Sequence, residues 1–262
     1  MALLARWRAD QLTYEDTGGT DACENGDGVA AWGIYEGTQA GNLATQATAG
    51  NQPIWNSNDG GYPSVSVTGS SVQRLDLAHS ASWVLTSFSW LAVVKVTQSQ
   101  YRHIWGRGAT WGNAGAYSDY NSGNPVANGI TFHTGYNTRW SNLNKPDLTS
   151  TTWLVVAGTA DGSCIKLNVN RQSSARLLAS QTVNFATNPL TLFGDGSSNG
   201  SYHMTGASRE FAFWDAALSE TEMANEIDAA MLRWGVTNTV APPSGGGGSQ
   251  LINGGLVRGQ VL

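Results

Sequence analysis

The sequence is poor in charged residues and has no long apolar run. Of its 262 residues only 13% are Asp, Glu, Lys or Arg, and 14 basic residues stand against 19 acidic ones. Phosphate binding depends on clustered basic side chains, so we expect no nucleic-acid partner. A membrane-spanning helix needs about 20 consecutive apolar residues. No stretch approaches that length, and we therefore expect no membrane span.

Cysteine is equally scarce. Cys23 and Cys164 are the two cysteines of the chain, and neither belongs to a Cys-x-x-Cys motif. A disulfide between them stays open, but two buried free thiols in a reducing compartment are the favoured interpretation. Residues 1–7 also lack the positively charged and then apolar pattern of a secretory signal. These absences predict a protein that is made in a cytoplasm.

Glycine and tryptophan are abundant, with 32 and 11 residues, and Thr, Ser and Asn are frequent. This composition favours β structure with long turns. The pattern is uniform over residues 1–240, and all-β domains of this size are often single. Eight segments are predicted as strands: residues 64–67, 89–97, 103–106, 129–133, 153–160, 164–169, 191–193 and 210–214.

Alternation supports several of these strands. In residues 164–169 the side chains of Ile165, Leu167 and Val169 share one face, as in a half-buried antiparallel strand. Asp161 and Gly162 precede it as a hairpin signal, and a second turn is expected near Arg171. Many strands separated by such turns predict a two-sheet antiparallel sandwich or jelly roll.

One helix is predicted near residue 220. Ser219 and Glu222 form a capping box, and Gly235 is a natural stop. Between them, one apolar stripe runs along the helix: Met223, Ile227, Met231 and Trp234. We expect this helix to lie across the sandwich and to cover an edge or an open end.

The carboxyl end departs from the rest of the chain. Residues 241–249 form a Pro/Gly/Ser linker, which predicts a stiff and then a flexible tether. Residues 250–262 follow as an apolar segment whose one charge is Arg258. Buried aliphatic side chains are each worth about 1.5–3 kcal/mol, so we expect burial against the chain's own globule, a sister subunit or another protein. A frayed terminus or an engineered linker is the alternative. The predicted docking residues are Leu251, Ile252, Leu256, Val257, Val261 and Leu262.

Several segments together resemble the concanavalin A-like, laminin-G-like jelly-roll domains. Residues 211–222 combine a strand, a Trp, the run Ala-Leu-Ser-x-x-Glu and a helix start, as at the end of that family's domains. The opening at residues 4–10 and 29–32 is similar to the family's, and residues 90–95 and 153–158 resemble its two long back-sheet strands. The resemblance covers about residues 1–240. It implies an all-β concanavalin A-like jelly roll with one C-terminal helix, followed here by an extended arm.

Members with this opening and an added short arm most resemble structural proteins of tailed bacteriophages. The resemblance implies a virion protein, such as a capsid decoration, fibre or tail-attached subunit. It would be a homo-oligomer, held to sister subunits or other virion proteins by residues 250–262, and possible contacts would include host cell-surface polysaccharide.

Catalytic motifs are few. Members of the resembled family that hydrolyse glucans share a Glu-x-Asp-x-Glu strand, in which alternation puts two carboxylates on one face. Residues 226–230 are the nearest match, but they lack the second Glu and lie in the predicted helix. The four histidines are scattered and fit no zinc or nucleophile motif: His79, His103, His133 and His203. We predict a protein that is not an enzyme, with a glycan hydrolase as the weaker alternative.

The stretch from residue 101 to residue 140 is the richest in binding chemistry. It interleaves Trp and Tyr with Asn, Asp, Arg and Gly. Flat rings match the apolar face of a sugar, and polar side chains bind its hydroxyls. Packing within the sandwich (for Trp105 and Trp140), subunit contacts and glycan binding all stay open. The tentative glycan-binding candidates are Trp111, Tyr117, Asp119, Tyr120 and Asn121.

A calcium site is only weakly indicated. Asp195 opens a Gly/Ser/Asn-rich run, where laminin-G-like domains can place that ion. Calcium takes six to eight oxygen ligands, several from carboxylates, and the neighbourhood offers few. A simple turn is therefore the favoured interpretation, and no cofactor is predicted.

Two functional hypotheses follow. The first is the virion structural protein, attached through its arm. The second is a carbohydrate-binding lectin module, whose arm makes an oligomer.

Overall fold

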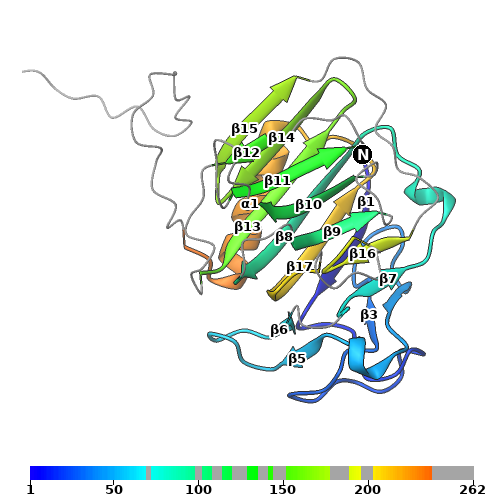
Figure 1. Cartoon of the computed structure of the whole chain (residues 1–262). Helices are drawn as coiled ribbons and strands as arrows, with labels where there is room; N and C mark the ends of the chain where they lie inside the picture. Colours follow the sequence, from blue (N-terminus) through cyan, green and yellow to red (C-terminus); the bar gives the residue numbers. More distant parts are fainter. Residues whose placement is uncertain are drawn as a thin grey trace, which may run out of the picture.

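A computed structural model of the chain describes residues 1–68, 72–97, 102–107, 114–119, 129–134, 141–143, 152–177, 189–195 and 203–237. These residues form two antiparallel sheets, one α-helix (α1, Glu220–Trp234) and two short 3-10 helices (η1, Ala49–Asn51, and η2, Ala81–Trp83). Figure 1 shows the two sheets one behind the other, with α1, in orange, on the far side. The predicted two-sheet jelly roll with one C-terminal helix is confirmed.

Sheet A has eight strands in the order β15-β14-β13-β8-β17-β6-β5, and β1 also pairs with β17. Its strands are β1 (Leu3–Arg8), β5 (Ile54–Asn56), β6 (Ser64–Val67), β8 (Phe88–Val96), β13 (Leu154–Ala160), β14 (Cys164–Val169), β15 (Gln172–Leu177) and β17 (Gly206–Trp214). The long strands β8, β13 and β17 lie side by side at its centre.

Sheet B has nine strands in the order β12-β11-β10-β9-β16-β7-β4-β3-β2. Its strands are β2 (Thr13–Tyr14), β3 (Ala31–Gly33), β4 (Leu43–Thr45), β7 (Leu75–Leu77), β9 (Arg102–Arg107), β10 (Ala114–Asp119), β11 (Gly129–Thr134), β12 (Ser141–Leu143) and β16 (Leu190–Leu192).

Aromatic rings fill the core between the sheets. Trp105 of sheet B packs edge-on against Phe213 of sheet A, with ring centroids 5.1 Å apart, and Trp90 meets Phe132 at 5.4 Å. Edge-to-face pairs at such distances add to the burial energy of each ring. Many of the tryptophans therefore pack in the core. Trp105 is an inward-facing strand residue, and Trp140 lies outside the described residues.

Helix α1 covers the outer face of sheet A, and the prediction that it covers an edge or an open end is wrong. Met223, Ile227 and Trp234 belong to a second apolar cluster. On the sheet side this cluster contains Leu91, Val93, Val155, Ala157, Ala212 and Trp214. The central strands of sheet A are apolar on both faces, so their outer face must also be buried, and α1 supplies the cover.

The ends of α1 are as predicted. The Ser219 hydroxyl accepts a hydrogen bond from the Glu222 amide, the Glu222 carboxylate accepts one from the Ser219 amide, and Gly235 adopts φ 61° at the C-cap. The start of the helix is also tied to sheet A, because the hydroxyl of buried Ser89 accepts from the Leu218 amide at 2.8 Å and donates to the Ala216 carbonyl at 3.0 Å.

The eight predicted strand segments all fall on strands, with shifts of a few residues at their ends. The Asp161 carboxylate accepts hydrogen bonds from the Ser163 and Cys164 amides in the β13–β14 turn. The next turn uses positive φ at Asn170 and Arg171 and leads into β15. Nine further strands in the described part of the chain are not among the predicted segments. Six of them have only two or three residues each: β2, β3, β4, β5, β7 and β12. The other three are β1, β10 and β15.

The linker at residues 241–249 and the arm at residues 250–262 lie outside the described residues, so both hypotheses stay predictions. Within the described part of the chain, no helix combines the length and apolar character needed to cross a membrane.

Candidate functional site

The outer face of sheet B carries a row of small and polar residues. Leu75 and Leu77 on β7 are buried in the core, so the intervening Asp76 lies on the other face. The same argument places Thr191 of β16 there, between two buried leucines. Strand pairing then defines one row across the sheet: Thr45, Asp76, Thr191, Gly106, Gly115 and His133.

Asp76 is the best-defined polar group of this row. Its Oδ1 accepts a hydrogen bond from the Thr191 hydroxyl at 2.7 Å, and its Oδ2 accepts one from Arg74 Nε at 2.9 Å. The side chains of Arg74 and Asp76 keep 20% and 30% of their surface exposed. A carboxylate and a guanidinium are thus held in place and remain open to solvent, which suits recognition of a ligand that carries hydroxyl groups.

A second row lies next to the first and contains one of the predicted binding residues. Tyr117 on β10 is paired with His103 on β9 and with Thr131 on β11, and Thr131 is paired with Asn142 on β12. Asp119 is paired with Gly129 at the end of β10. The other predicted candidates lie outside the described residues: Trp111, Tyr120 and Asn121.

The segment at Asp195 packs directly on this face. A Cβ atom added to Gly106 would lie only 2.9 Å from the Asp195 Cα and 3.1 Å from the Gly194 carbonyl oxygen. Glycine is therefore required at residue 106 for the close approach. The tertiary structure thus brings two segments that the sequence keeps apart, Asp195 and the β9–β10 region, to one side of the sandwich.

In the described part of the chain, no group of three His, Cys, Asp or Glu residues is placed to hold a metal ion. The absence of a cofactor and the weak calcium alternative at Asp195 both stay predictions. Nearby, the backbones of His103 and His203 pair in an isolated parallel β-bridge. His79 instead contacts the buried Arg107, with 3.1 Å between Nδ1 and Nη2. Burial lowers the pKa of Arg107 to about 10.

The carboxylates of residues 226–230 lie on α1, as predicted, and both are engaged by arginines. Glu226 Oε2 accepts from Arg6 Nη2 at 2.7 Å, and Asp228 pairs with Arg171. Neither residue lies near the outer face of sheet B, because α1 packs on sheet A.

Arg6 connects this helix to a buried ion network. Glu210 of β17 is only 1% exposed, and its Oε2 accepts from Arg233 Nη1 at 2.5 Å and from Trp234 Nε1 at 2.6 Å. Arg6 Nε lies 3.3 Å from Glu210 Oε1, close enough for an ion pair but without hydrogen-bond geometry. Arg6 also binds the exposed Glu36 at 3.0 Å. The network ties β1, β17 and the last turn of α1 together.

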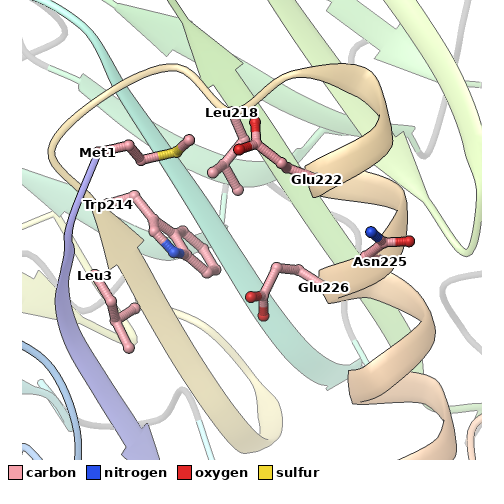
Figure 2. A pocket seen from close by; sticks show the side chains of 7 residues that line it. All are labelled: Met1, Leu3, Trp214, Leu218, Glu222, Asn225 and Glu226. Atoms are coloured by element: carbon pink, nitrogen blue, oxygen red, sulfur yellow. The ribbon is translucent and has the colours of Figure 1, made fainter.

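A hollow of about 280 Å³ opens beside this network. Figure 2 shows β1 and α1 as its two walls, with Trp214 of β17 between them. Its lining residues are Met1, Leu3, Trp214, Leu218, Glu222, Asn225 and Glu226. The hollow lies on the helix side of sheet A, so it is separated from the Asp76 row by the whole sandwich.

Both cysteines are free thiols, but both are only partly buried, so the expectation that they are buried is wrong. Burial is the largest cause that raises the pKa of Cys23 to about 12, and the negative charges of Asp27 and Glu15 raise it further. Only about one thiol in ten thousand is then ionised at pH 8, and the thiolate is the nucleophile. We expect iodoacetamide to alkylate Cys23 at least about 100-fold more slowly in the folded chain than in urea.

Peptide mass spectrometry at pH 7–10 measures this rate, which should rise about tenfold per pH unit without a plateau. Equal rates in the folded and unfolded chain would contradict the expectation.

Comparison with known proteins identifies the fold family. A search of curated protein sequences finds no match. A family model described as "Concanavalin A-like lectin/glucanases superfamily" matches residues 59–224.

Three solved structures are similar at low identity, which bears on the fold alone. Domain 4 of AbnA, a GH43 extracellular arabinanase from Geobacillus stearothermophilus solved with arabinotriose, has a TM-score of 0.52 at 16% identity, covering 86% of this chain and 98% of that one. The binding domain of Paraclostridial Mosquitocidal Protein 1 has a TM-score of 0.56 at 8% identity, with 88% and 52% covered. Trypanosoma rangeli sialidase in complex with sialic acid has a TM-score of 0.55 at 13% identity, with 90% and 34% covered, so this chain spans about a third of it. The chain belongs to the concanavalin A-like lectin/glucanase superfamily.

Proposed function

We propose that the chain is a non-enzymatic glycan-binding module whose site lies on the outer face of sheet B. The observation that carries the proposal is the solvent-accessible carboxylate of Asp76, held by Thr191 and Arg74 on that face. The fold adds support, because the similar Domain 4 of AbnA was solved with arabinotriose and matches over 98% of its length.

The chemistry of the row suits a sugar. Hydroxyl groups both donate and accept hydrogen bonds, and Asp76 and Arg74 provide one charged acceptor and one charged donor. Tyr117, in the neighbouring row, is our candidate for stacking against the apolar face of the ring. The site would thus combine polar recognition with one aromatic contact.

Binding without hydrolysis is supported by the carboxylates. Glycoside hydrolysis commonly uses two carboxyl groups that flank the bond. The Glu226 and Asp228 pair, which comes nearest to the hydrolase sequence motif, is engaged by Arg6 and Arg171 on the opposite side of the sandwich.

Titration calorimetry with arabinan oligosaccharides and sialylated glycans tests the proposal. Hydrogen bonds to charged groups contribute about 1.5–3 kcal/mol, so Asp76→Ala should weaken binding roughly 10- to 150-fold. Tyr117→Ala should weaken it similarly. Asp228→Ala, which removes an exposed carboxylate on α1, is the matched control and should leave the affinity unchanged. Equal affinities of Asp76→Ala and the wild type, or release of reducing ends from the oligosaccharides, would overturn the proposal.

A second candidate function concerns attachment. We also propose that residues 250–262 fasten the domain to a larger assembly, as a decoration, fibre or tail-attached protein of a bacteriophage virion. The support is the sequence, in which a Pro/Gly/Ser tether precedes six aliphatic residues and one charge. Deleting residues 244–262 should leave a folded domain that no longer joins its assembly, and normal incorporation of the truncated chain would refute attachment.

A further inference from the structure

The hollow between β1 and α1 has a mixed lining. Met1 is 62% exposed, and Leu3 and Leu218 contribute further aliphatic surface around the indole of Trp214. Figure 2 shows the Glu222 and Glu226 carboxylates on the helix side of this apolar surface. A chain segment with aliphatic side chains and a single positive charge would complement it.

The two carboxylates are suited to receive a positive charge. Hydrogen bonds from the Ser219 side chain and backbone lower the pKa of Glu222, which keeps it ionised at neutral pH. Glu226 binds Arg6 through Oε2, so its Oε1 is left as a further acceptor. Asn225, between them, is exposed and adds an amide.

The same chain contains a segment with this chemistry. Residues 250–262 include six aliphatic residues, and Arg258 is their one charged residue, directly after Leu256 and Val257. We propose that residues 250–262 dock into the hollow of their own domain, with Leu256 and Val257 against Leu3, Leu218 and Trp214. Arg258 then lies beside Glu222 and Glu226.

The tether is long enough for this docking. The description of the chain ends at residue 237, just after α1, and 18 residues separate that point from Leu256. A flexible coil of this length spans about 21–25 Å on average. Along α1, the distance from Trp234 back to Glu226 is only about 12 Å, at 1.5 Å per residue. Short flexible tethers give effective concentrations near the millimolar range, so a weak contact within one chain suffices.

Docking of this kind is independent of glycan binding. The hollow lies over sheet A, whereas the Asp76 row lies on the outer face of sheet B. With the attachment hypothesis it shares only the premise that the arm must be buried. In this proposal the arm binds its own domain when the protein is free in solution.

Disulfide trapping in the full chain tests the proposal. In a background with Cys23→Ser and Cys164→Ser, Asn225→Cys is combined with Val257→Cys. Leu232→Cys with Val257→Cys is the matched control, because Leu232 is 85% exposed on the same helix. Under one oxidant, the Asn225 pair should close within a single chain at least about tenfold faster than the Leu232 pair, since the docked arm is held at high local concentration.

Adding Arg258→Glu should reduce the rate for the Asn225 pair to that of the control. This substitution lies in the arm, so circular dichroism should show an unchanged domain. Equal rates for the two pairs, or disulfides that form mainly between two chains, would overturn docking within the chain. A chain that loses assembly on deletion of residues 244–262 but shows equal trapping rates would refute this inference and leave the attachment hypothesis standing.

Discussion

Replacing Glu210 with alanine should lower the free energy of unfolding by about 3–5 kcal/mol, the cost of removing one partner of a buried ion pair. The Glu210 side chain is 1% exposed and accepts from both Arg233 and Trp234. Alanine would leave the largely buried Arg6 without one of its partners and the Trp234 indole N–H without an acceptor. Because these groups belong to β1 and α1, the loss should loosen the helix from sheet A.

Urea unfolding followed by tryptophan fluorescence measures this change. Glu36→Ala is the matched control, since Glu36 binds the same Arg6 but keeps 52% of its side-chain surface exposed. Exposed ion pairs contribute about 0–1 kcal/mol, so the control should differ little from the wild type. Equal losses for Glu210→Ala and Glu36→Ala would refute the idea that burial makes Glu210 important.

The second large effect is expected at Gly206, the first residue of β17. Its φ is +140°, and a Cβ atom there would lie 1.9 Å from the Lys95 carbonyl oxygen and 2.9 Å from the Lys95 carbonyl carbon. Both are backbone atoms of the neighbouring central strand β8, so no side-chain rotation relieves the clash. Gly206→Ala should therefore cost more than about 4 kcal/mol or prevent folding, a loss beyond the usual range of single substitutions.

Gly41→Ala separates the steric clash from the cost of the positive φ. Gly41 also has a positive φ, +89°, but nothing lies within 4 Å of its added Cβ. In this control only the unfavourable backbone conformation should lower the free energy of unfolding, by about 1–3 kcal/mol. Melting temperatures and soluble yields of the two variants measure the difference. If the two substitutions were equally destabilising, the strand-to-strand clash would not be the cause.

The ion network that stabilises the fold and the candidate site lie on different sheets. The ion network, α1 and the hollow all lie on sheet A, whereas the Asp76 row and Tyr117 lie on sheet B. Substitutions at Glu210 therefore test the scaffold, and substitutions at Asp76 test recognition. This division matters because one fold supports many functions, and function must be argued from the site itself.

The sequence indicates only part of the proposed site. Tyr117 is a candidate from the sequence, and its role stays a prediction; the structure adds its neighbours across the sheet, His103 and Thr131. Asp76, on which the proposed site rests, is not among the candidates from the sequence, because Leu75 and Leu77 give only one repeat of the period-two alternation. That strand is only three residues long, too short for the pattern to stand out.

Local signals in the sequence determined the strands with clear alternation, the capping box at Ser219 and the turn at Asp161, because each depends on residues within one or two turns of chain. The tertiary structure alone decided which elements meet. Asp76 and Thr191 are 115 residues apart, and Arg6 and Glu226 are 220 apart. Alternation determines which face a side chain occupies but not which strand lies beside it, since pairing depends on packing across the whole sandwich.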